Sequence, residues 1–352
     1  IVVVDTGSLD RTPHICEELG ARVLHSRWQD SFSQARNISL SLARGEWIFW
    51  MDSDDTLPEQ CGKKLRQLVD GPHRDNLLGY IAQVHCPGES PDDVTVVDHV
   101  KLIRNLPDLR FDFHIHEQIL PAIRRLGGDV AWTDLYVVHS GSDKTPAGRK
   151  RKLDRDFRLL ALDLAEHPNH PFVLFNLGMT HADAGNHLEA IRHLIRCIEV
   201  SGAQESHLRK TYALLVGSLM QLGHLDQAAI YLTEGLQHFP IDTELLFRRA
   251  MLQHQTGQLE DAVDTYLRLL AQREERHFTS IDSGLVDHKT RHNLAIVYED
   301  LGMPNQAEQQ WREILKTRPN YAPARRALSG QPELKPIRGA TLNGLSDCTK
   351  SS

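Results

Sequence analysis

The stretch Trp47-Ile48-Phe49-Trp50-Met51-Asp52-Ser53-Asp54-Asp55 decides the fold of the first half of this chain. Its five apolar residues follow a helix-stop signal at Gly45 and Glu46, and they predict a short strand that is buried on both faces. The sequence then becomes acidic, so the strand would carry carboxylates to one edge of a sheet. In an open α/β sheet, ligands bind outside the carboxyl ends of the strands.

Asp52 and Asp54 are the first candidate ligands at this edge. Side chains two residues apart on an extended chain project to the same side, so both carboxylates can face one cation. Carboxylate oxygens suit Mg²⁺ or Mn²⁺, which keep part of their coordination shell for water and substrate phosphates. An isolated D-x-D pattern is also typical of a solvated acidic turn, so the flanking sequence has to decide.

The composition indicates a soluble globular protein with two domains. The chain has 352 residues, of which 25% are charged and 40% hydrophobic. The formal net charge of -7 argues against a general nucleic-acid binder but leaves a local phosphate site open. The five cysteines form no C-x-x-C pair, and the sequence has neither a signal peptide nor an apolar run of the roughly 18 residues that span a bilayer. The cytoplasm is therefore the expected location.

Apolar runs and helical patterns alternate at the start of the chain. Strands are predicted at residues 1–4, 21–25 and 47–51, and helices at 12–20, 33–45 and beyond Pro58. This alternation predicts a parallel α/β sheet. Residues 78–104 are expected to be extended and partly antiparallel, and a last apolar run at 135–138 leads to His139.

Six short motifs lie in order along this region. They are I-V-V-V-D-T-G-S-L-D-R-T at 1–12, A-R-N at 35–37, G-E-W-I-F-W-M-D-S-D-D at 45–55, K-L-I-R-N at 101–105, H-I-H-E at 114–117 and V-V-H-S-G at 137–141. The first three resemble family 2 glycosyltransferases with the GT-A fold, and the last three resemble the branch of that family that carries a helical repeat domain. The resemblance covers about residues 1–145 and implies a Rossmann-like nucleotide-diphospho-sugar transferase domain. Such enzymes normally begin with an additional strand that helps to hold the nucleotide base, so we expect this chain to be N-terminally truncated.

The resemblance also implies roles for individual residues. Asp5 would accept a hydrogen bond from the nucleobase, and Arg36 would lie near the nucleotide, where a guanidinium suits phosphate. Asp52, Asp54 and His139 would hold the Mn²⁺ or Mg²⁺ ion that bridges the diphosphate of a nucleoside diphosphate sugar, with Asp52 also contacting this donor. Structural alternatives remain open: a turn cap for Asp5, a surface ion pair for Arg36 and a structural histidine for His139. Asp55 would bind the ion or stabilise the loop.

The transfer also needs a base that deprotonates the acceptor. Glu117 is the candidate by its place in the H-I-H-E motif, His116 is the alternative, and the family implies inversion at the anomeric carbon. His114, His116 and Glu117 could be mistaken for a zinc cluster. The motif lacks the helical spacing of H-E-x-x-H, which argues against a separate metal site.

The second half of the chain repeats. Glycines at 185, 223, 257 and 302 are each followed after five residues by alanine, at 190, 228, 262 and 307, and after nine by Leu194, Leu232, Tyr266 and Trp311. The glycines recur at gaps of 38, 34 and 45 residues, and a base period of 34 is that of tetratricopeptide repeats. We predict a linker helix at 146–170 that opens with a basic run, about four repeats forming an α-solenoid at 171–330, and a disordered tail at 331–352. The longest gap would hold a loop at 273–287.

Two functional hypotheses follow. The first is a metal-dependent transferase that moves a sugar from a nucleoside diphosphate donor to an unknown acceptor, with the repeats binding a polypeptide acceptor or a protein partner. The second is a protein-interaction scaffold whose transferase half is inactive, and packing or dimerisation through the repeats is equally open. A phosphatase or nucleotidyl enzyme is disfavoured, because no nucleophile or phosphate-cradling glycine loop accompanies the acidic stretch.

Overall fold

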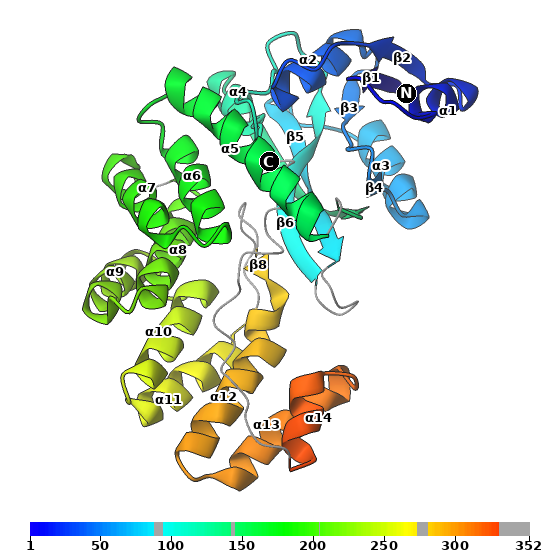
Figure 1. Cartoon of the computed structure of the whole chain (residues 1–352). Helices are drawn as coiled ribbons and strands as arrows, with labels where there is room; N and C mark the ends of the chain where they lie inside the picture. The colour runs from blue at the N-terminus through cyan, green and yellow to red at the C-terminus, as the bar shows by residue number, and fades with distance from the viewer. Residues whose placement is uncertain (88–93, 142–144, 204, 273–280, 331–352) are drawn as a thin grey trace. The chain divides into compact units, whose positions relative to one another are not determined.

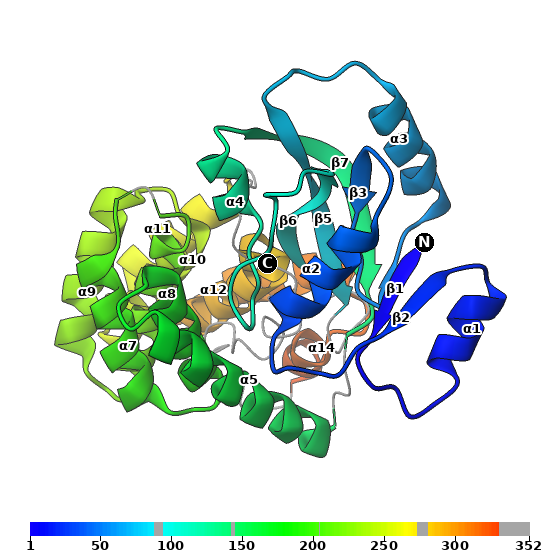
Figure 2. The same cartoon turned by 90° about the horizontal axis from the view of Figure 1, so that it is seen from above.

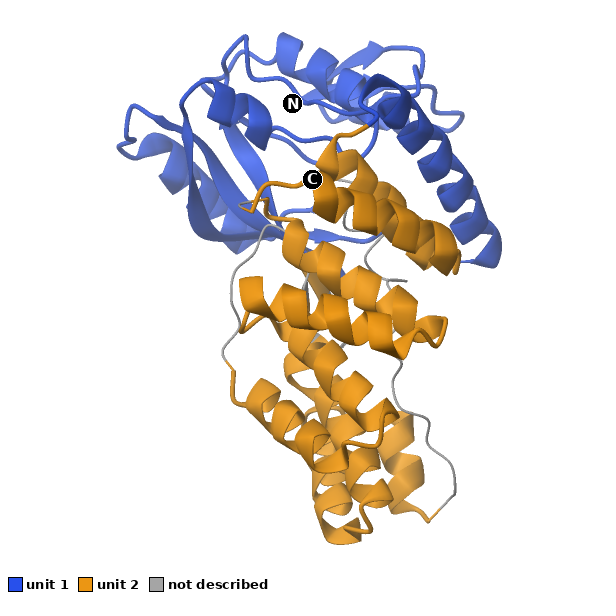
Figure 3. Cartoon of the chain, turned by 90° about the vertical axis from the view of Figure 1, so that its left-hand side faces the viewer, with its two compact units in different colours: residues 1–86, 97–168, 347–352 blue, residues 87–96, 169–346 orange. Residues whose placement is uncertain are grey.

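The computed structural model describes residues 1–87, 94–141, 145–203, 205–272 and 281–330. The chain forms two compact units (Figure 3). Unit 1 comprises residues 1–86 with the described parts of 97–168, and unit 2 comprises the described parts of 87–96 and 169–330. Within the described ranges, no helix combines the length and the apolar character that crossing a membrane requires.

Unit 1 alternates strands and helices, as expected for an α/β domain (Figure 1). Its elements are β1 (Val2–Asp5), α1 (Thr12–Glu18), β2 (Arg22–His25), α2 (Phe32–Leu42), β3 (Trp47–Phe49), β4 (Asp55–Thr56), α3 (Glu59–Asp70), β5 (Leu77–Pro87), β6 (Val94–Arg104), α4 (Leu120–Arg125), β7 (Asp129–His139) and α5 (Pro146–Glu166). The Pro13 ring suits the first turn of α1, because an amide there has no partner within the helix. Helix α1 lies beside β2 in both views (Figures 1 and 2).

The strands form two sheets rather than the single parallel sheet that the alternation predicted. Strands β1 and β2 pair in parallel with each other, whereas β3 joins a second sheet with the order β3-β6-β5-β7-β4. In that sheet β3 runs antiparallel to β6, β4 runs antiparallel to β7, and β5 runs parallel to β7. The prediction of one parallel sheet was therefore wrong, because apolar periodicity identifies a strand without identifying its partner.

The strand predicted at residues 47–51 is also less buried than expected. Trp47, Ile48 and Phe49 are only half-buried, Trp50 is buried, and Met51 is 38% exposed. Strand β5 is more enclosed than β3, and its Ile81 and Val84 are 1% and 0% exposed. Strand β3 lies at one end of its sheet, so a single neighbouring strand covers it, whereas β5 has a strand on each side.

Helix α5, predicted as a linker, packs onto unit 1. Its Asp163 accepts backbone N–H bonds from His114 at 2.8 Å and from Ile115 at 3.4 Å, and its Arg158 pairs with Asp30. Leu159 is fully buried, so the helix contributes to the core as well. Within the basic run, residues 149–151 are exposed, whereas the fourth residue, a lysine, is buried.

Unit 2 is an array of helical hairpins, which confirms the predicted all-α second half. The hairpins are α6 (Pro171–Asp183) with α7 (His187–Val200), α8 (Leu208–Gln221) with α9 (Leu225–His238), α10 (Thr243–Gln255) with α11 (Leu259–Leu270), and α12 (His288–Asp300) with α13 (Pro304–Thr317). Helix α14 (Ala322–Leu328) follows, and β8 (Ile281–Asp282) with the 3₁₀ turn η1 (Ser283–Val286) precedes α12. Strand β8 pairs antiparallel with Thr95 and Val96, the start of β6, which belongs to unit 2.

The repeated glycine, alanine and bulky residues lie where the repeat spacing predicts them. The four glycines follow the first helix of each hairpin at φ between 71° and 79°, a left-handed conformation that favours glycine. The four alanines are 0–2% exposed and the four bulky residues 0–5% exposed. Small alanines therefore let paired helices approach while the bulky residue fills the space beside them. Residues 273–280 of the predicted loop and the predicted disordered tail lie outside the described residues.

Candidate active site

Pairing of β4 with β7 brings the acidic stretch to His139. Asp55 and His139 are direct partners across these strands, and the backbone N–H of Ser140 donates to the Asp54 carbonyl at 3.0 Å. One ligand atom from each of Asp52, Asp54, Asp55 and His139 lies within 4.8 Å of the others. The three residues predicted to hold a metal are therefore gathered at one edge of the sheet.

Asp55 is the most enclosed of the three carboxylates. Its side chain is fully buried, and it accepts from Lys101 Nζ at 2.7 Å, from the Asp52 backbone N–H at 3.0 Å and from His139 Nδ1 at 2.9 Å. Lys101 is itself 0% exposed, so the structure contains a buried chain from ammonium to carboxylate to imidazole. Asp54 is different, because its side chain is 35% exposed. Of these two residues, Asp54 is thus the one open to a ligand from solvent.

These contacts shift the pKa values of Asp55, His139 and Lys101. Burial alone would raise the pKa of Asp55, but the hydrogen bond to His139 and the charge of Lys101 hold that pKa below its ordinary value. Burial would lower the pKa of His139, whereas its bond to Asp55 and the charge of Asp54 raise it. Burial lowers the pKa of Lys101 despite the nearby carboxylates. Asp55 is therefore an anion held between two donors.

Arg36 links the acidic stretch to the H-I-H-E motif. From α2 its Nη2 donates to Asp52 Oδ1 at 2.6 Å, and its Nε donates to Glu117 Oε1. Burial would lower the pKa of Arg36, but Asp52 and Glu117 raise it, so the guanidinium stays charged. The predicted surface alternative for Arg36 does not apply, because its side chain is only 12% exposed.

The indole ring of Trp50 contacts both cations of the site, Arg36 and Lys101. Its indole lies 4.2 Å from the Arg36 guanidinium carbon and 3.8 Å from Lys101 Nζ, within the range of cation–π attraction. Its Nε1 donates to the Val100 carbonyl at 2.7 Å, which fixes the ring. Trp50 thus stabilises the two positive charges that the carboxylates bind.

Glu117 and His116 are enclosed. The Glu117 side chain is 0% exposed and His116 is 2% exposed, with a left-handed backbone at φ 56°. Burial raises the pKa of Glu117, although Arg36 opposes the shift. Glu117 Oε2 accepts no hydrogen bond from any described residue. That oxygen is the atom of Glu117 that remains available to take a proton.

Asp5 makes its contacts within its own turn and sheet. Its carboxylate accepts from the backbone N–H groups of Ser8 at 3.1 Å and Gly7 at 3.4 Å, and His25 Nδ1 lies 3.2 Å away. Hydrogen bonding to Ser8, against the opposing effect of burial, lowers the pKa of Asp5. This is the turn-capping geometry that the sequence left open, and a nucleobase contact stays a prediction.

The donor set fits a hard divalent cation. Asp52 and Asp54 offer carboxylate oxygens, and His139 offers an imidazole, a better ligand for Mn²⁺ than for Mg²⁺. His139 Nε2 is buried, and no described residue is its hydrogen-bond partner. A carboxylate on the opposite ring nitrogen is the usual arrangement around a metal-binding histidine. No converging group of three ligands among the described residues includes His114, His116 or Glu117, so a zinc cluster there finds no support.

Two residues of the site escaped the sequence analysis. Lys101 stands in Val100-Lys101-Leu102-Ile103, where a lysine within a buried apolar strand signals a charged partner. Trp50 was treated only as part of an apolar run. For Asp55, the alternative of stabilising the loop agrees with the contacts to Lys101 and His139.

Comparison with known proteins bears out the two-part organisation. Residues 1–94 match the family described as Glycosyl transferase family 2, and residues 215–276 match the Tetratricopeptide repeat. The chain therefore combines a family 2 glycosyltransferase segment with tetratricopeptide repeats, and this prediction is confirmed.

Several relatives share one or both parts. A TPR repeat-containing protein of Synechococcus elongatus is 28% identical over 76% of this chain and 58% of its own length. The glycosyltransferase SunS of Bacillus subtilis is 23% identical over 76% of this chain and 64% of its own length. Glycosyltransferase GlyG of Streptococcus pneumoniae is 36% identical over 22% of this chain and 28% of its own. The chain thus spans about three fifths of the length of the first two of these relatives.

The solved structures that are similar to this chain include tetratricopeptide proteins. A thermophilic TPR protein of Thermus thermophilus is 20% identical, with a TM-score of 0.41 over 51% of this chain and 91% of that one.

Proposed function

We propose that unit 1 transfers a sugar from a nucleoside diphosphate donor to an acceptor nucleophile, and that Asp52, Asp54 and His139 hold a divalent ion, Mn²⁺ or Mg²⁺, during the reaction. The observation that carries the proposal is the convergence of these three side chains at one sheet edge, where Asp52 and Asp54 belong to the segment that matches family 2 glycosyltransferases. Bound there, such an ion would act as a Lewis acid towards the diphosphate.

The residues around this group would position the donor. Arg36 is a charged donor whose Nη2 is held by Asp52, and a guanidinium at this position suits a phosphate oxygen. Asp55 and Lys101 would keep the His139 ring in one orientation. At the end of β1, Asp5 would accept a hydrogen bond from the nucleobase.

Glu117 would be the base that takes a proton from the acceptor, with inversion at the anomeric carbon. Its raised pKa and its unbonded Oε2 support this role. Because the carboxylate is enclosed in this structure, the acceptor or a side-chain movement has to open a path to Oε2. His116 remains the alternative base.

The test measures release of nucleoside diphosphate from a panel of nucleotide sugars, with and without Mn²⁺. We expect Asp54→Ala to lower the Mn²⁺-dependent rate by about 100-fold, the usual scale for removing an electrostatic contact to a transferring group. Asp70→Ala, at an exposed position of α3, is the matched control and should retain the rate. Equal rates for the parent chain and Asp54→Ala would reject the metal assignment.

The competing proposal is a protein-interaction scaffold with an inactive transferase half. It draws support from the four intact hairpins and from the relative named for its TPR repeats. Calorimetry with uridine and guanosine diphosphates in the presence of Mn²⁺ separates the two proposals. Binding that Asp54→Ala weakens supports the transferase, whereas the absence of any heat from either nucleotide supports the scaffold.

A further inference from the structure

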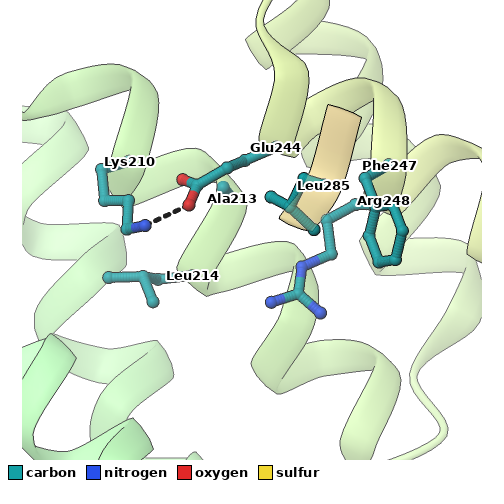
Figure 4. A pocket seen from close by; sticks show the side chains of 7 residues that line it. All are labelled: Lys210, Ala213, Leu214, Glu244, Phe247, Arg248 and Leu285. Atoms are coloured by element: carbon teal, nitrogen blue, oxygen red, sulfur yellow. Dashed lines mark hydrogen bonds and ion pairs between the residues drawn. The ribbon is translucent and has the colours of Figure 1, made fainter. Parts of the chain in front are cut away.

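His99 of β6 is a buried histidine whose polar atoms are unmatched. The residue is 3% exposed, and neither ring nitrogen has a hydrogen-bond partner among the described residues. Two other buried side chains show the usual arrangement: Lys210 pairs with Glu244 beside a pocket between α8, α10 and η1 (Figure 4), and Lys101 pairs with Asp55. A buried polar group without a partner costs free energy, so the unmatched imidazole points to a group that it binds.

The pairing of the strands brings His99 to the acidic stretch. Strand β3 runs antiparallel to β6 up to the pair Phe49 and Leu102, and the Trp50 backbone N–H continues this pairing by donating to the Lys101 carbonyl at 3.1 Å. The chain therefore enters the acidic stretch beside the part of β6 that precedes Lys101, which includes His99. Side chains two residues apart in a strand share a face, so His99 projects to the same side of β6 as Lys101.

The ring of His99 lies among the charged groups of the site. Its centroid is 6.2 Å from that of Trp50, the indole that also contacts Arg36 and Lys101. Burial, with a further effect of Lys101, lowers the pKa of His99 well below its ordinary value, although Asp52 opposes the shift. The imidazole is therefore uncharged at neutral pH, and it offers one N–H donor and one acceptor nitrogen.

A neutral imidazole suits only some of the groups that a sugar donor brings to this site. The side chains that converge as cation ligands, among the described residues, do not include His99. A diphosphate oxygen only accepts hydrogen bonds, so it suits the charged Arg36 better and leaves the acceptor nitrogen of His99 unmatched. A hydroxyl both donates and accepts, so it can form a hydrogen bond with either nitrogen. A sugar hydroxyl is therefore the best match.

We propose that His99 forms a hydrogen bond with a hydroxyl of the transferred sugar and so contributes to the choice of donor. This role rests on the proposed transfer of a sugar from a nucleoside diphosphate. In such a donor the sugar is joined to the diphosphate, so a diphosphate at Asp52 and Asp54 brings the sugar hydroxyls to the same part of the site. Because His99 is enclosed, a side-chain movement has to open a path to its ring, as for Glu117.

Calorimetry on the full chain with Mn²⁺ compares nucleoside diphosphates with nucleotide sugars. The probes are uridine diphosphate, UDP-glucose, UDP-N-acetylglucosamine, guanosine diphosphate and GDP-mannose. His99→Phe keeps a planar ring but has no polar side-chain atom. We expect it to weaken the nucleotide sugar that the parent binds most tightly by about tenfold, because one hydrogen bond to a hydroxyl is lost. Binding of the free nucleoside diphosphate should stay unchanged.

Deoxy analogues of that sugar, one for each hydroxyl, identify the group that His99 binds. The parent should bind one analogue about tenfold more weakly than the full sugar, whereas His99→Phe should bind the two alike. His99→Gln keeps an amide donor and acceptor, so it should restore part of the selectivity. A histidine with a structural role alone would show neither the selective loss nor the rescue.

His73→Phe is the matched control in unit 1. The His73 ring lies 4.7 Å from that of Trp47, and its nitrogens contact Tyr80 Oη at 2.8 Å and the Val69 carbonyl at 3.1 Å. Its replacement should lower the urea midpoint of unfolding and leave sugar binding unchanged. His99→Phe should weaken sugar binding without lowering that midpoint, since it removes a buried polar group that has no hydrogen bond to lose.

Several outcomes would overturn the role of His99 while leaving the transfer reaction standing. They are a lower urea midpoint for His99→Phe, equal weakening of the nucleoside diphosphate and the nucleotide sugar, and deoxy analogues that all bind the parent like the full sugar. Unchanged binding of the nucleotide sugar by His99→Phe would overturn the assignment to the donor sugar. Failure of the proposed function looks different: the parent itself gives no heat with any of these nucleotides, and the role of His99 falls with it.

Discussion

His139 Nδ1 lies 2.9 Å from Asp55 Oδ1, although 84 residues separate the two side chains in the sequence. The antiparallel pairing of β4 with β7 sets this contact, since the two residues are direct partners across it. The same nitrogen lies 3.5 Å from Asp54 Oδ1, and Nε2 has no hydrogen-bond partner among the described residues. Asp55 therefore orients a ligand of the proposed metal site, while Asp52 and Asp54 would contact the ion.

Asp55→Asn should weaken the binding of Mn²⁺ without abolishing it. An amide holds the imidazole less firmly than a carboxylate does, and loss of such an outer partner typically costs 10–100-fold in metal affinity, so we expect about that factor. Electron paramagnetic resonance of free Mn²⁺ measures the affinity directly. Asp75→Asn, at an exposed position before β5, should leave the affinity unchanged, and a similar loss in both variants would refute the orienting role.

Lys101→Met should destabilise unit 1. The substitution leaves the buried Asp55 carboxylate without its cation, and breaking a buried ion pair typically costs about 3–5 kcal/mol in the free energy of unfolding. Urea denaturation followed by tryptophan fluorescence measures this loss. Lys64→Met breaks the exposed pair with Asp134 and should leave the free energy of unfolding close to that of the parent chain.

A double variant checks the cause of that loss. Asp55→Asn in the Lys101→Met background removes the stranded charge, so the free energy of unfolding should partly recover. A double variant less stable than Lys101→Met would point instead to lost packing of the lysine stem on Trp50.

Tyr266→Ala should destabilise unit 2, because the side chain is fully buried at the bulky position of the third repeat. Truncating a buried aromatic residue leaves a cavity and typically costs about 3–5 kcal/mol. Leu267→Ala, at a neighbouring residue that is 42% exposed, should cost about 1 kcal/mol or less. Denaturation followed by circular dichroism measures both variants, and equal losses would contradict the assigned packing role.

His207 should make unit 2 less stable in mild acid. Burial, with a smaller effect of His170, lowers the pKa of His207 to about 4, from an ordinary value near 6.5. Between these two values the unfolded chain binds more protons than the folded chain, so stability falls as pH falls through this window. From pH 7.5 to pH 5 the imidazole should account for about 2 kcal/mol of that fall.

His207→Gln should remove this part of the pH dependence. The measurement is the free energy of unfolding of parent and variant at pH 7.5 and pH 5, compared as a difference so that other titrating groups cancel. His224→Gln, at an exposed histidine, should retain the parent's pH dependence. A parent and a His207→Gln variant with the same pH dependence would contradict the assignment.

The sequence predicted local features better than it predicted pairing. Ala262 and Tyr266 were placed correctly because a repeat presents the same contact at each period, and both are fully buried. Strand β3 was assigned to a parallel sheet, whereas it pairs with β6 more than 50 residues away, for example through Ile48 and Ile103. Periodicity holds no information about such distant partners.

For the candidate site, the sequence predicted which residues take part but not how deeply their side chains are buried. Asp52, Asp54 and His139 were grouped as metal ligands through the resemblance to family 2 glycosyltransferases. The burial of Glu117 and the position of Lys101 depend on side chains from several elements, so they required the structure.

The two-residue strand β4 also constrains the length of the acidic turn. Its short ladder determines which aspartate faces the enclosed lysine and which faces solvent. Insertion or deletion of a single residue between Trp50 and Asp55 would shift the register and exchange those environments, leaving a carboxylate at each place but in the wrong surroundings. Natural variation in this turn should consequently preserve its residue count at least as strictly as its acidity.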